Sequence, residues 1–116
     1  MTRIYLAGAI RNQPYLNVPA FRAAAEKLRA EGHEVYDPME ETITEFGDAI
    51  WQTNVAGDED IAVQRGFNRR LAMADNCDWL CHHADAIALL PGWERSRGAK
   101  AERALAIALG LEVIYL

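Results

Sequence analysis

The chain has 116 residues, enough for one domain with its own hydrophobic core but too few for a separate substrate domain. Its formal net charge of −5 argues against a broad nucleic-acid or anionic-membrane surface, because both partners require clustered positive charge. It has no signal-peptide layout and no apolar run long enough to span a membrane, so we expect a cytoplasmic protein that binds neither nucleic-acid polymers nor membranes.

The first third of the chain predicts a βαβ unit. Residues 3–7 are rich in β-branched and aromatic side chains and predict a strand that ends at Gly8. After a loop, Asn17 is a candidate N-cap for a helix whose apolar residues recur at helical spacing as far as residues 31–32. Residues 33–36 predict a second strand, which Asp37-Pro38 ends. A right-handed crossover between the two strands is expected.

Residues 39–66 have no regular apolar period, and acidic and aromatic residues are mixed in them, a pattern that leaves room for short helices. A segment of this length inside a small domain is usually functional or mobile. We interpret it as a lid or a subunit contact, and a surface insertion is the alternative. Phe46 and Trp51 could stack on a planar base, or each could simply fill core.

The second half continues the alternation of helices and strands. It predicts a helix over residues 67–83, a buried strand over 85–90, a helix beginning near Gly98 and a final strand over 111–115. The sum is a single α/β domain over residues 1–116. We expect a three-layer, Rossmann-like or flavodoxin-like fold, with a mostly parallel sheet of four or five strands and helices on both faces.

Cys77 and Cys81 lie four residues apart in a predicted helix, followed by His82 and His83. This spacing places both thiols on one helix face, so reduced thiols are favoured over a disulfide. The paired two-residue spacings of strong zinc motifs are absent. We therefore favour ordinary helix-face residues over a metal site and expect neither a metal nor a cofactor.

Three predicted strands end at one edge of the sheet, where open α/β folds place ligands. The segments that meet there are residues 8–11, residues 37–38 and residues 91–102. Glu102 shares a helix stripe with Leu105 and Ala106, which predicts a position at the rim of the buried face. A Glu in the first turns of a helix is also favoured by the helix dipole alone, which is the alternative explanation.

Residues 5–11, Tyr-Leu-Ala-Gly-Ala-Ile-Arg, and the pattern Ser96-x-Gly98-x-x-x-Glu102 resemble the nucleoside 2-deoxyribosyltransferase superfamily. The resemblance covers almost the whole chain. It is strongest to a small branch that shares the Leu-Leu-Pro-Gly-Trp-Glu segment of residues 89–94, and it extends more distantly to the 2'-deoxynucleoside 5'-monophosphate N-glycosidases.

The resemblance implies that Glu102 is the nucleophile and that Tyr5 holds it in place. Ser96 stands where transferases acting on free nucleosides carry an Asp and where the monophosphate glycosidases carry a phosphate-binding Ser. A serine hydroxyl with nearby arginines accepts a phosphate that an aspartate would repel, which favours a nucleoside 5'-monophosphate. The candidate phosphate-binding residues are Gly8, Ile10, Arg11, Ser96, Arg97 and Gly98, and the candidate base-pocket residues are Phe46, Trp51 and Trp93.

The superfamily's acid, an Asp on the preceding helix, is harder to match. The expected position falls near Asn76 or Cys77, so Asp75 and Asp78 are the candidates, each with a small shift in register. A solvated helix carboxylate is the alternative for both. Lys100 is a second departure, because the monophosphate glycosidases carry a glycine there.

The implied activity is cleavage of an N-glycosidic bond through a covalent glycosyl-Glu102 intermediate, by hydrolysis or by transfer to a second base. Two other classes of function stay open. One is a nucleotide-binding or sensing protein without turnover, and the other is an interaction module on the same scaffold. The resemblance also implies a homo-oligomer, in which a neighbouring subunit completes the site.

Overall fold

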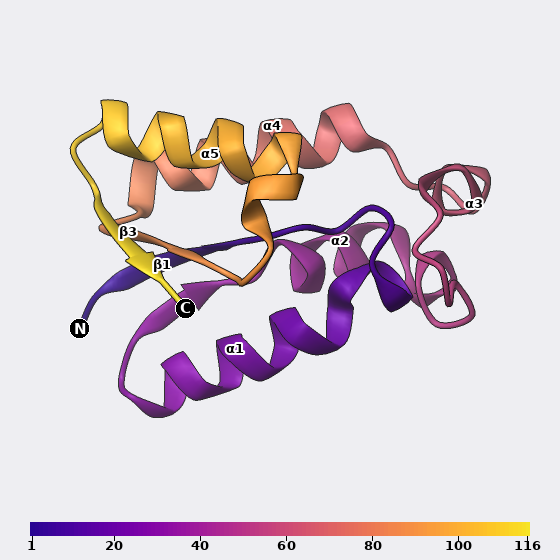
Figure 1. Ribbon diagram of the computed structural model, residues 1–116, viewed down its shortest axis with the longest axis horizontal. Coiled ribbons are helices and arrows are strands. Elements are labelled where there is room, and N and C mark those ends of the chain that lie inside the picture. Colours follow the sequence, from indigo (N-terminus) through magenta and orange to yellow (C-terminus); the bar gives the residue numbers. More distant parts are fainter.

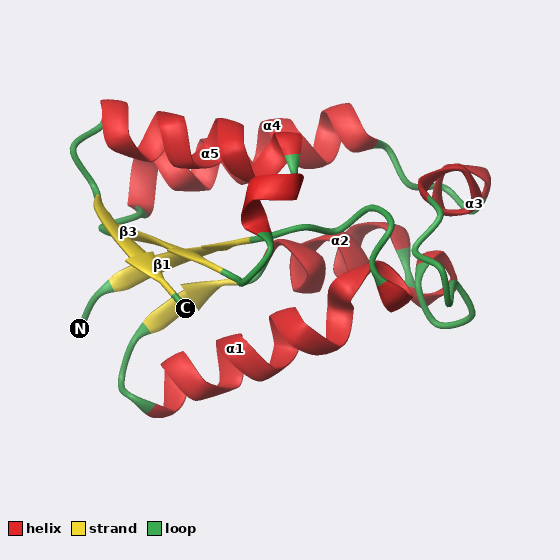
Figure 2. Ribbon diagram, viewed as in Figure 1, coloured by secondary structure: helices red, strands yellow, loops and turns green.

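The computed structural model describes residues 1–116 and contains four strands and five helices. Figure 1 colours these elements by their position along the chain, and Figure 2 distinguishes the strands from the helices by colour in the same view. The strands are β1 (Arg3–Ala7), β2 (Glu34–Tyr36), β3 (Ala86–Leu89) and β4 (Glu112–Tyr115). The helices are α1 (Val18–Ala30), α2 (Pro38–Phe46), α3 (Glu59–Gln64), α4 (Arg69–His83) and α5 (Arg97–Ala108), joined by short 3-10 turns at Pro14–Asn17, Asp48–Ile50 and Trp93–Arg95.

The four strands form one parallel sheet in the order β2-β1-β3-β4. This is the flavodoxin-like order, in which the chain moves outward from β1 in one direction to β2 and in the other to β3. Ligands of such folds bind outside the carboxyl ends of the strands at this change of direction. The predicted fold class is therefore confirmed, with four strands, and the β1/β3 switch point is where a site is expected.

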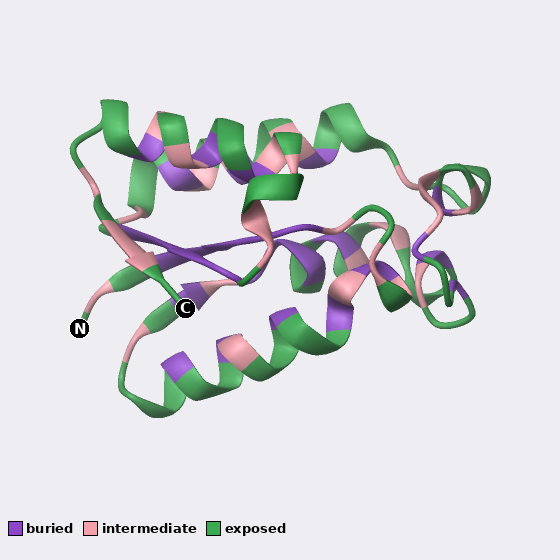
Figure 3. Ribbon diagram, in the orientation of Figure 1, coloured by how far each residue is buried: buried purple, intermediate pink, exposed green.

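Alternate side chains of the two central strands face opposite layers, as the period of a strand requires. Ile4 and Leu6 of β1 pack with Phe21 and Leu28 of α1 in one core cluster. On the other face, Tyr5 packs in a second cluster that includes residues of α4 and α5. Figure 3 shows β1 and β3 buried between these helical layers. Both faces of the sheet are thus covered, as in other parallel sheets.

The segment of residues 39–66 is more regular than its sequence predicts. Most of α2 lies in it, and Asp37 caps that helix by accepting from the backbone N–H groups of Met39 and Glu40. Pro38 occupies the first helical turn, so the residue that ends β2 also begins the next helix. The Asp37-Pro38 pair therefore starts a helix as well as ending a strand, and α2 and α3 are the short helices that the irregular pattern allowed.

The expected cap of α1 is also different in the structure. Asn17 has left-handed backbone geometry, with φ of 60°, and its side chain donates to the carbonyl of Ala9 instead of capping the helix. Tyr15 and Leu16 share this positive φ. Asn17 therefore ties the start of α1 to the end of β1. No helix of the fold has the length and apolar character needed to cross a membrane.

Candidate functional site

Glu102 and Tyr5 meet in the layer between the sheet and α5. Tyr5 lies in the middle of β1, and its hydroxyl donates a hydrogen bond to Glu102 Oε2. Tyr5 is fully buried and Glu102 is only 7% exposed, so the carboxyl group is inside the protein, deeper than the predicted rim position. It sits on the second turn of α5, where the small residues Ala99 and Ala106 let the helix approach the sheet.

The surroundings of Glu102 favour its neutral form. Burial raises the pKa of Glu102 from its ordinary value to about 7, and the hydrogen bond from Tyr5 opposes this by stabilising the carboxylate. Burial, and then the Glu102 charge, raise the pKa of Tyr5 well above its ordinary value, so the phenol remains a donor. A buried carboxyl group whose pKa lies near 7 suits acid, base or nucleophilic chemistry.

Aromatic rings extend from Tyr5 away from Glu102. Tyr36, the last residue of β2, stacks on Tyr5 with 5.4 Å between the ring centroids, and Trp79 of α4 stacks on Tyr36 at 4.9 Å. The Tyr36 hydroxyl donates to Asn76 Oδ1 on α4 at 3.0 Å. Burial, and then the carboxylates of Glu41, Asp75, Glu102 and Glu45, raise the pKa of Tyr36. The stack connects Glu102 to the space between α2 and α4.

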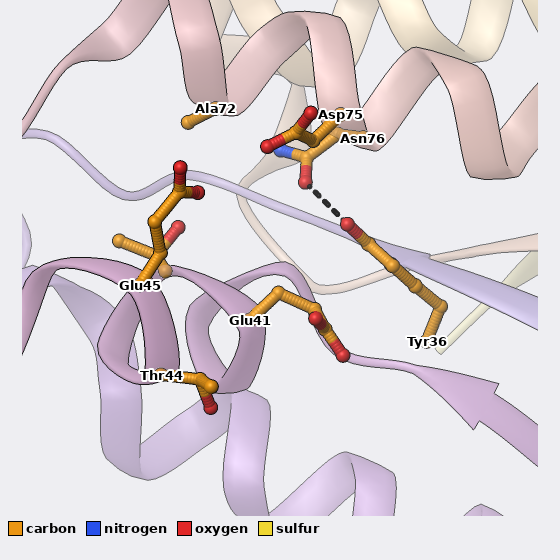
Figure 4. A pocket seen from close by; sticks show the side chains of 8 residues that line it. Tyr36, Glu41, Thr44, Glu45, Ala72, Asp75 and Asn76 are labelled. Carbon is orange, nitrogen blue, oxygen red and sulfur yellow. Dashed lines mark hydrogen bonds between the residues drawn. The ribbon is translucent and has the colours of Figure 1, made fainter.

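That space contains a cavity of about 190 Å³. Figure 4 shows Asp75 and Asn76 of α4 facing Glu41 and Glu45 of α2, with Tyr36 on the wall between them. Loss of hydration, and then the facing Asp75 carboxylate, raise the pKa of Glu45. Of the two candidate acids, Asp75 thus lines a cavity beside the aromatic stack, whereas Asp78 is exposed and forms an ion pair with His82 at 3.5 Å.

The start of α5 holds the candidate anion-binding groups. Ser96 is the N-cap of α5, and its Oγ accepts from the backbone N–H of Ala99 at 3.1 Å. Its hydroxyl proton is free to donate elsewhere. Gly98 lies in the first turn beside Ser96, where a Cβ would stand 3.4 Å from Met73 of α4. Arg97 is exposed in the same turn.

The loop after β1 carries the other phosphate-binding candidates, Gly8, Ile10 and Arg11, and the first two are engaged in packing. Gly8 is buried against Leu90, and a Cβ there would approach the Leu90 side chain to 2.9 Å. Ile10 packs against the α1 core cluster, so only its backbone is available to a ligand. Arg11 is half exposed and forms an ion pair with Glu59 at 3.6 Å, and Glu59 also pairs with Arg69 at 3.4 Å.

The three candidate base-pocket residues are engaged in packing. Phe46 makes an edge-to-face contact with Phe67 at 5.6 Å. Trp51 donates through Nε1 to Asp48 and carries Arg22 over its ring. Trp93 packs near Tyr115, with Arg103 over its ring. None of the three lines the cavity between α2 and α4.

Tyr36 and Asn76 were missed by sequence reasoning, although one signal existed. Tyr36 immediately precedes Asp37-Pro38 and therefore ends a strand at the ligand edge of the sheet. Asn76 is one of the two positions at which the resemblance placed the acid, and the structure buries it against Tyr36. Only the packing of α4 over β2 brings these two residues together.

The cysteines are free, and Cys77 lies near Glu102. Burial, and then Glu102, raise the pKa of the Cys77 thiol, which disfavours its reactive thiolate form. Its Sγ lies 3.7 Å from Met73 Sδ. Nowhere in the fold are three or more His, Cys, Asp or Glu side chains grouped so as to hold a metal ion.

The fold and this geometry define a small flavodoxin-like α/β protein with a buried carboxyl group hydrogen-bonded to the central strand β1 of its parallel sheet. The chain belongs to the family described as "Domain of unknown function (DUF4406)", whose model matches residues 2–115. No curated protein and no solved structure matches the chain.

Proposed function

We propose that the protein cleaves the N-glycosidic bond of a nucleoside 5'-monophosphate, with Glu102 as the nucleophile. The observation that carries this proposal is the buried pair of Tyr5, in the middle of β1, and Glu102, on the second turn of α5, the helix whose start Ser96 caps. A carboxylate desolvated in this way stabilises positive charge developing on a sugar more than a hydrated one does.

The reaction is a retaining displacement. A Glu102 carboxylate oxygen forms a bond to the anomeric carbon C1', while the bond from C1' to the base nitrogen breaks and its electron pair leaves with the base. Asp75 supplies the proton that the departing base takes up. Water, or the ring nitrogen of a second base, then gives its proton to the now ionised Asp75 and forms a bond to C1', while the bond from C1' to Glu102 breaks and frees the carboxylate. The choice of acceptor decides between hydrolysis and transfer.

The phosphate is proposed to sit at the start of α5. The helix has 12 residues, and its unpaired backbone N–H groups and positive dipole end favour an anion there. The Ser96 hydroxyl and the Arg97 guanidinium add donors, and Arg11 adds another when it releases Glu59. Held at this end, the phosphate fixes C1' relative to Glu102, which lies further along the same helix.

The test is release of free base from a panel of ribonucleoside and deoxyribonucleoside 5'-monophosphates, followed by chromatography. We expect release by the wild type and none by Glu102→Gln, which preserves the shape of the side chain and its acceptor for Tyr5. Glu26→Gln, an exposed position on α1, is the matched control and should retain full activity. Nucleotide binding without release from any substrate would contradict the proposal and support a non-catalytic nucleotide-binding protein.

We also propose that the working form is a homo-oligomer. Exposed apolar side chains at the end of α5 and on the edge strand β4, such as Leu109 and Tyr115, are available for a subunit contact. Sedimentation equilibrium at micromolar concentration tests this, and a mass equal to one chain at all concentrations would contradict it.

A further inference from the structure

The cavity between α2 and α4 has features that the proposed reaction does not use. Its volume of about 190 Å³ corresponds to about six water molecules at about 30 Å³ each, which suits a small planar group better than a whole nucleotide. Tyr36 forms part of its wall and stacks on Tyr5, the partner of Glu102. A group held in the cavity therefore lies on the same side of the sheet as the carboxyl group proposed to react.

The lining of the cavity is rich in hydrogen-bond acceptors. Three carboxylates line it, Glu41 and Glu45 from α2 and Asp75 from α4, and no Lys, Arg or His does. Figure 4 shows the carboxylates on both sides of the space. Asp75 is the proposed proton donor, whereas Glu41 and Glu45 accept hydrogen bonds and do not donate them when ionised, so their side of the lining selects ligands that present N–H groups.

A buried amide gives an independent indication of a ligand. Asn76 is only 9% exposed and lines the cavity, and the one hydrogen bond its side chain makes is the one that Oδ1 accepts from Tyr36. Its Nδ2 makes no hydrogen bond within the protein and is not fully enclosed, so this donor is accessible to a ligand at the cavity. One donor beside several acceptors is the complement of a heterocycle edge that carries an amino group next to a ring nitrogen or carbonyl.

We propose that this cavity binds the base of the substrate and selects bases with an exocyclic amino group, namely cytosine, adenine or guanine, over uracil and thymine. This inference rests on the proposed function, because it takes the ligand of the Glu102 site to be a nucleotide. The carboxylates accept from the amino group, and Asn76 Nδ2 donates to the neighbouring ring nitrogen or carbonyl. Uracil and thymine present carbonyl oxygens on both sides of their ring N–H, and these oxygens face carboxylates unfavourably.

A metal ion and a basic peptide are the competing occupants. The carboxylates are not grouped closely enough for three of them to hold one ion. An extended peptide needs an open groove, whereas Tyr36 forms a wall on one side of this space, and stacking on Trp79 and Tyr5 holds that wall in place.

The experiment is calorimetric titration with dCMP, dUMP, CMP, UMP, AMP and GMP, using Glu102→Gln so that turnover does not consume the ligand. We expect dCMP to bind at least about tenfold more tightly than dUMP, since dUMP would set its carbonyl oxygens against carboxylates where dCMP presents an amino group, and tenfold corresponds to about 1.4 kcal/mol. Adding Glu45→Gln should reduce this ratio by about tenfold, because an amide can donate to the uracil carbonyl. Adding Glu26→Gln instead is the matched control and should leave the ratio unchanged.

Equal affinity for dCMP and dUMP, or a ratio that Glu45→Gln and Glu41→Gln both leave unchanged, would overturn the inference. Preferential binding of dCMP with no base release by the wild type would uphold the inference and contradict the proposed function. Base release that favours uracil nucleotides would uphold the proposed function and contradict the inference on base selection. If no nucleotide binds, both proposals fail.

Discussion

A buried carboxyl group with a raised pKa makes the stability of the fold depend on pH. The pKa of Glu102 is about 7 in the folded chain and ordinary in the unfolded chain, so between these two values the folded state holds more protons. The contribution of Glu102 to stability is therefore complete below about pH 4 and falls as the pH rises through 7. The loss amounts to roughly 3 kcal/mol, at about 1.4 kcal/mol for each unit of pKa difference.

Glu102→Gln should remove this dependence. Urea denaturation of the wild type and the variant at pH 5 and pH 8 measures it, and the other titrating groups, including the buried Asp37, are common to both chains. We expect the variant to gain roughly 2.5 kcal/mol relative to the wild type on going from pH 5 to pH 8, since a small part of the loss has already occurred at pH 5. Parallel pH dependence in the two proteins would show that Glu102 titrates as an ordinary exposed carboxyl group.

Tyr5→Phe tests the hydrogen bond to the nucleophile. The Tyr5 hydroxyl stabilises the carboxylate, so its removal should raise the pKa of Glu102 above 7. In the proposed mechanism the rate of base release rises as Glu102 ionises, and the rising limb of the pH profile should move to higher pH in the variant. Tyr115→Phe is the control, because that exposed hydroxyl accepts from Arg103 and does not contact Glu102. Identical profiles for wild type and Tyr5→Phe would refute the positioning role.

At the scale of elements, Ser96 combines a structural and a proposed binding role. Aspartate is as good an N-cap as serine, so Ser96→Asp should leave stability within about 0.5 kcal/mol, whereas Ser96→Ala should cost about 1 kcal/mol. An aspartate also repels a phosphate bound at the start of α5. We therefore expect Ser96→Asp to weaken binding of a nucleoside monophosphate at least about tenfold and to spare the free nucleoside. Equal effects on both ligands would place the phosphate elsewhere.

The segment between α2 and α4 is held by one buried amide. Asn54 is 2% exposed, and its side chain donates to the carbonyls of Ile50 and Asp58 and accepts from the Asp58 N–H. Its own carbonyl accepts from the backbone of Tyr15 in the loop after β1. Asn54 therefore ties two loops at the ligand edge of the sheet into one wall.

Asn54→Ala should destabilise the protein by at least about 2 kcal/mol, because it leaves several buried backbone groups without partners. Hydrogen exchange at the backbone N–H groups of Asp58 and Tyr15 should accelerate more than exchange in β1. Gln52→Ala, at an exposed position of the same segment, is the control. Unchanged exchange at Tyr15 would show that the two loops move independently.

The elements that the sequence predicted well are those whose signal is local. Strand composition and the glycines and proline that follow gave β1, β2 and β3, and helical spacing gave α1, α4 and α5. The start of α2 was missed because Asp37-Pro38 both ends a strand and begins a helix.

In the site, Tyr5 and Glu102 were paired through the family resemblance, whereas Tyr36 and Asn76 meet only through the packing of α4 against the strand edge.

At the scale of the whole molecule, the protein has a negative net charge although its proposed ligand is an anion. The net charge of −5 opposes polynucleotides, which bind through many arginines and lysines at once. Two arginines, Arg11 and Arg69, also share a single acidic partner, Glu59, which offsets one of their two positive charges. A mononucleotide needs only one local site. A substitution at Glu59 should therefore change the affinity for a mononucleotide and leave the affinity for a polynucleotide unchanged.

Glu59→Gln removes the acidic partner while keeping the side-chain size. If Arg11 contributes to the proposed phosphate site, its release from Glu59 should tighten binding of a nucleoside monophosphate by roughly threefold to tenfold. The gain should shrink as salt is raised from 0.05 to 0.5 M, because exposed charges about 10 Å apart are already screened near 0.1 M.

Fluorescence anisotropy of a labelled DNA duplex at physiological salt should show no binding by either protein, since one freed pair of arginines does not overcome the net charge. Tight duplex binding by the wild type would contradict the charge argument, and an unchanged mononucleotide affinity would remove Arg11 from the site.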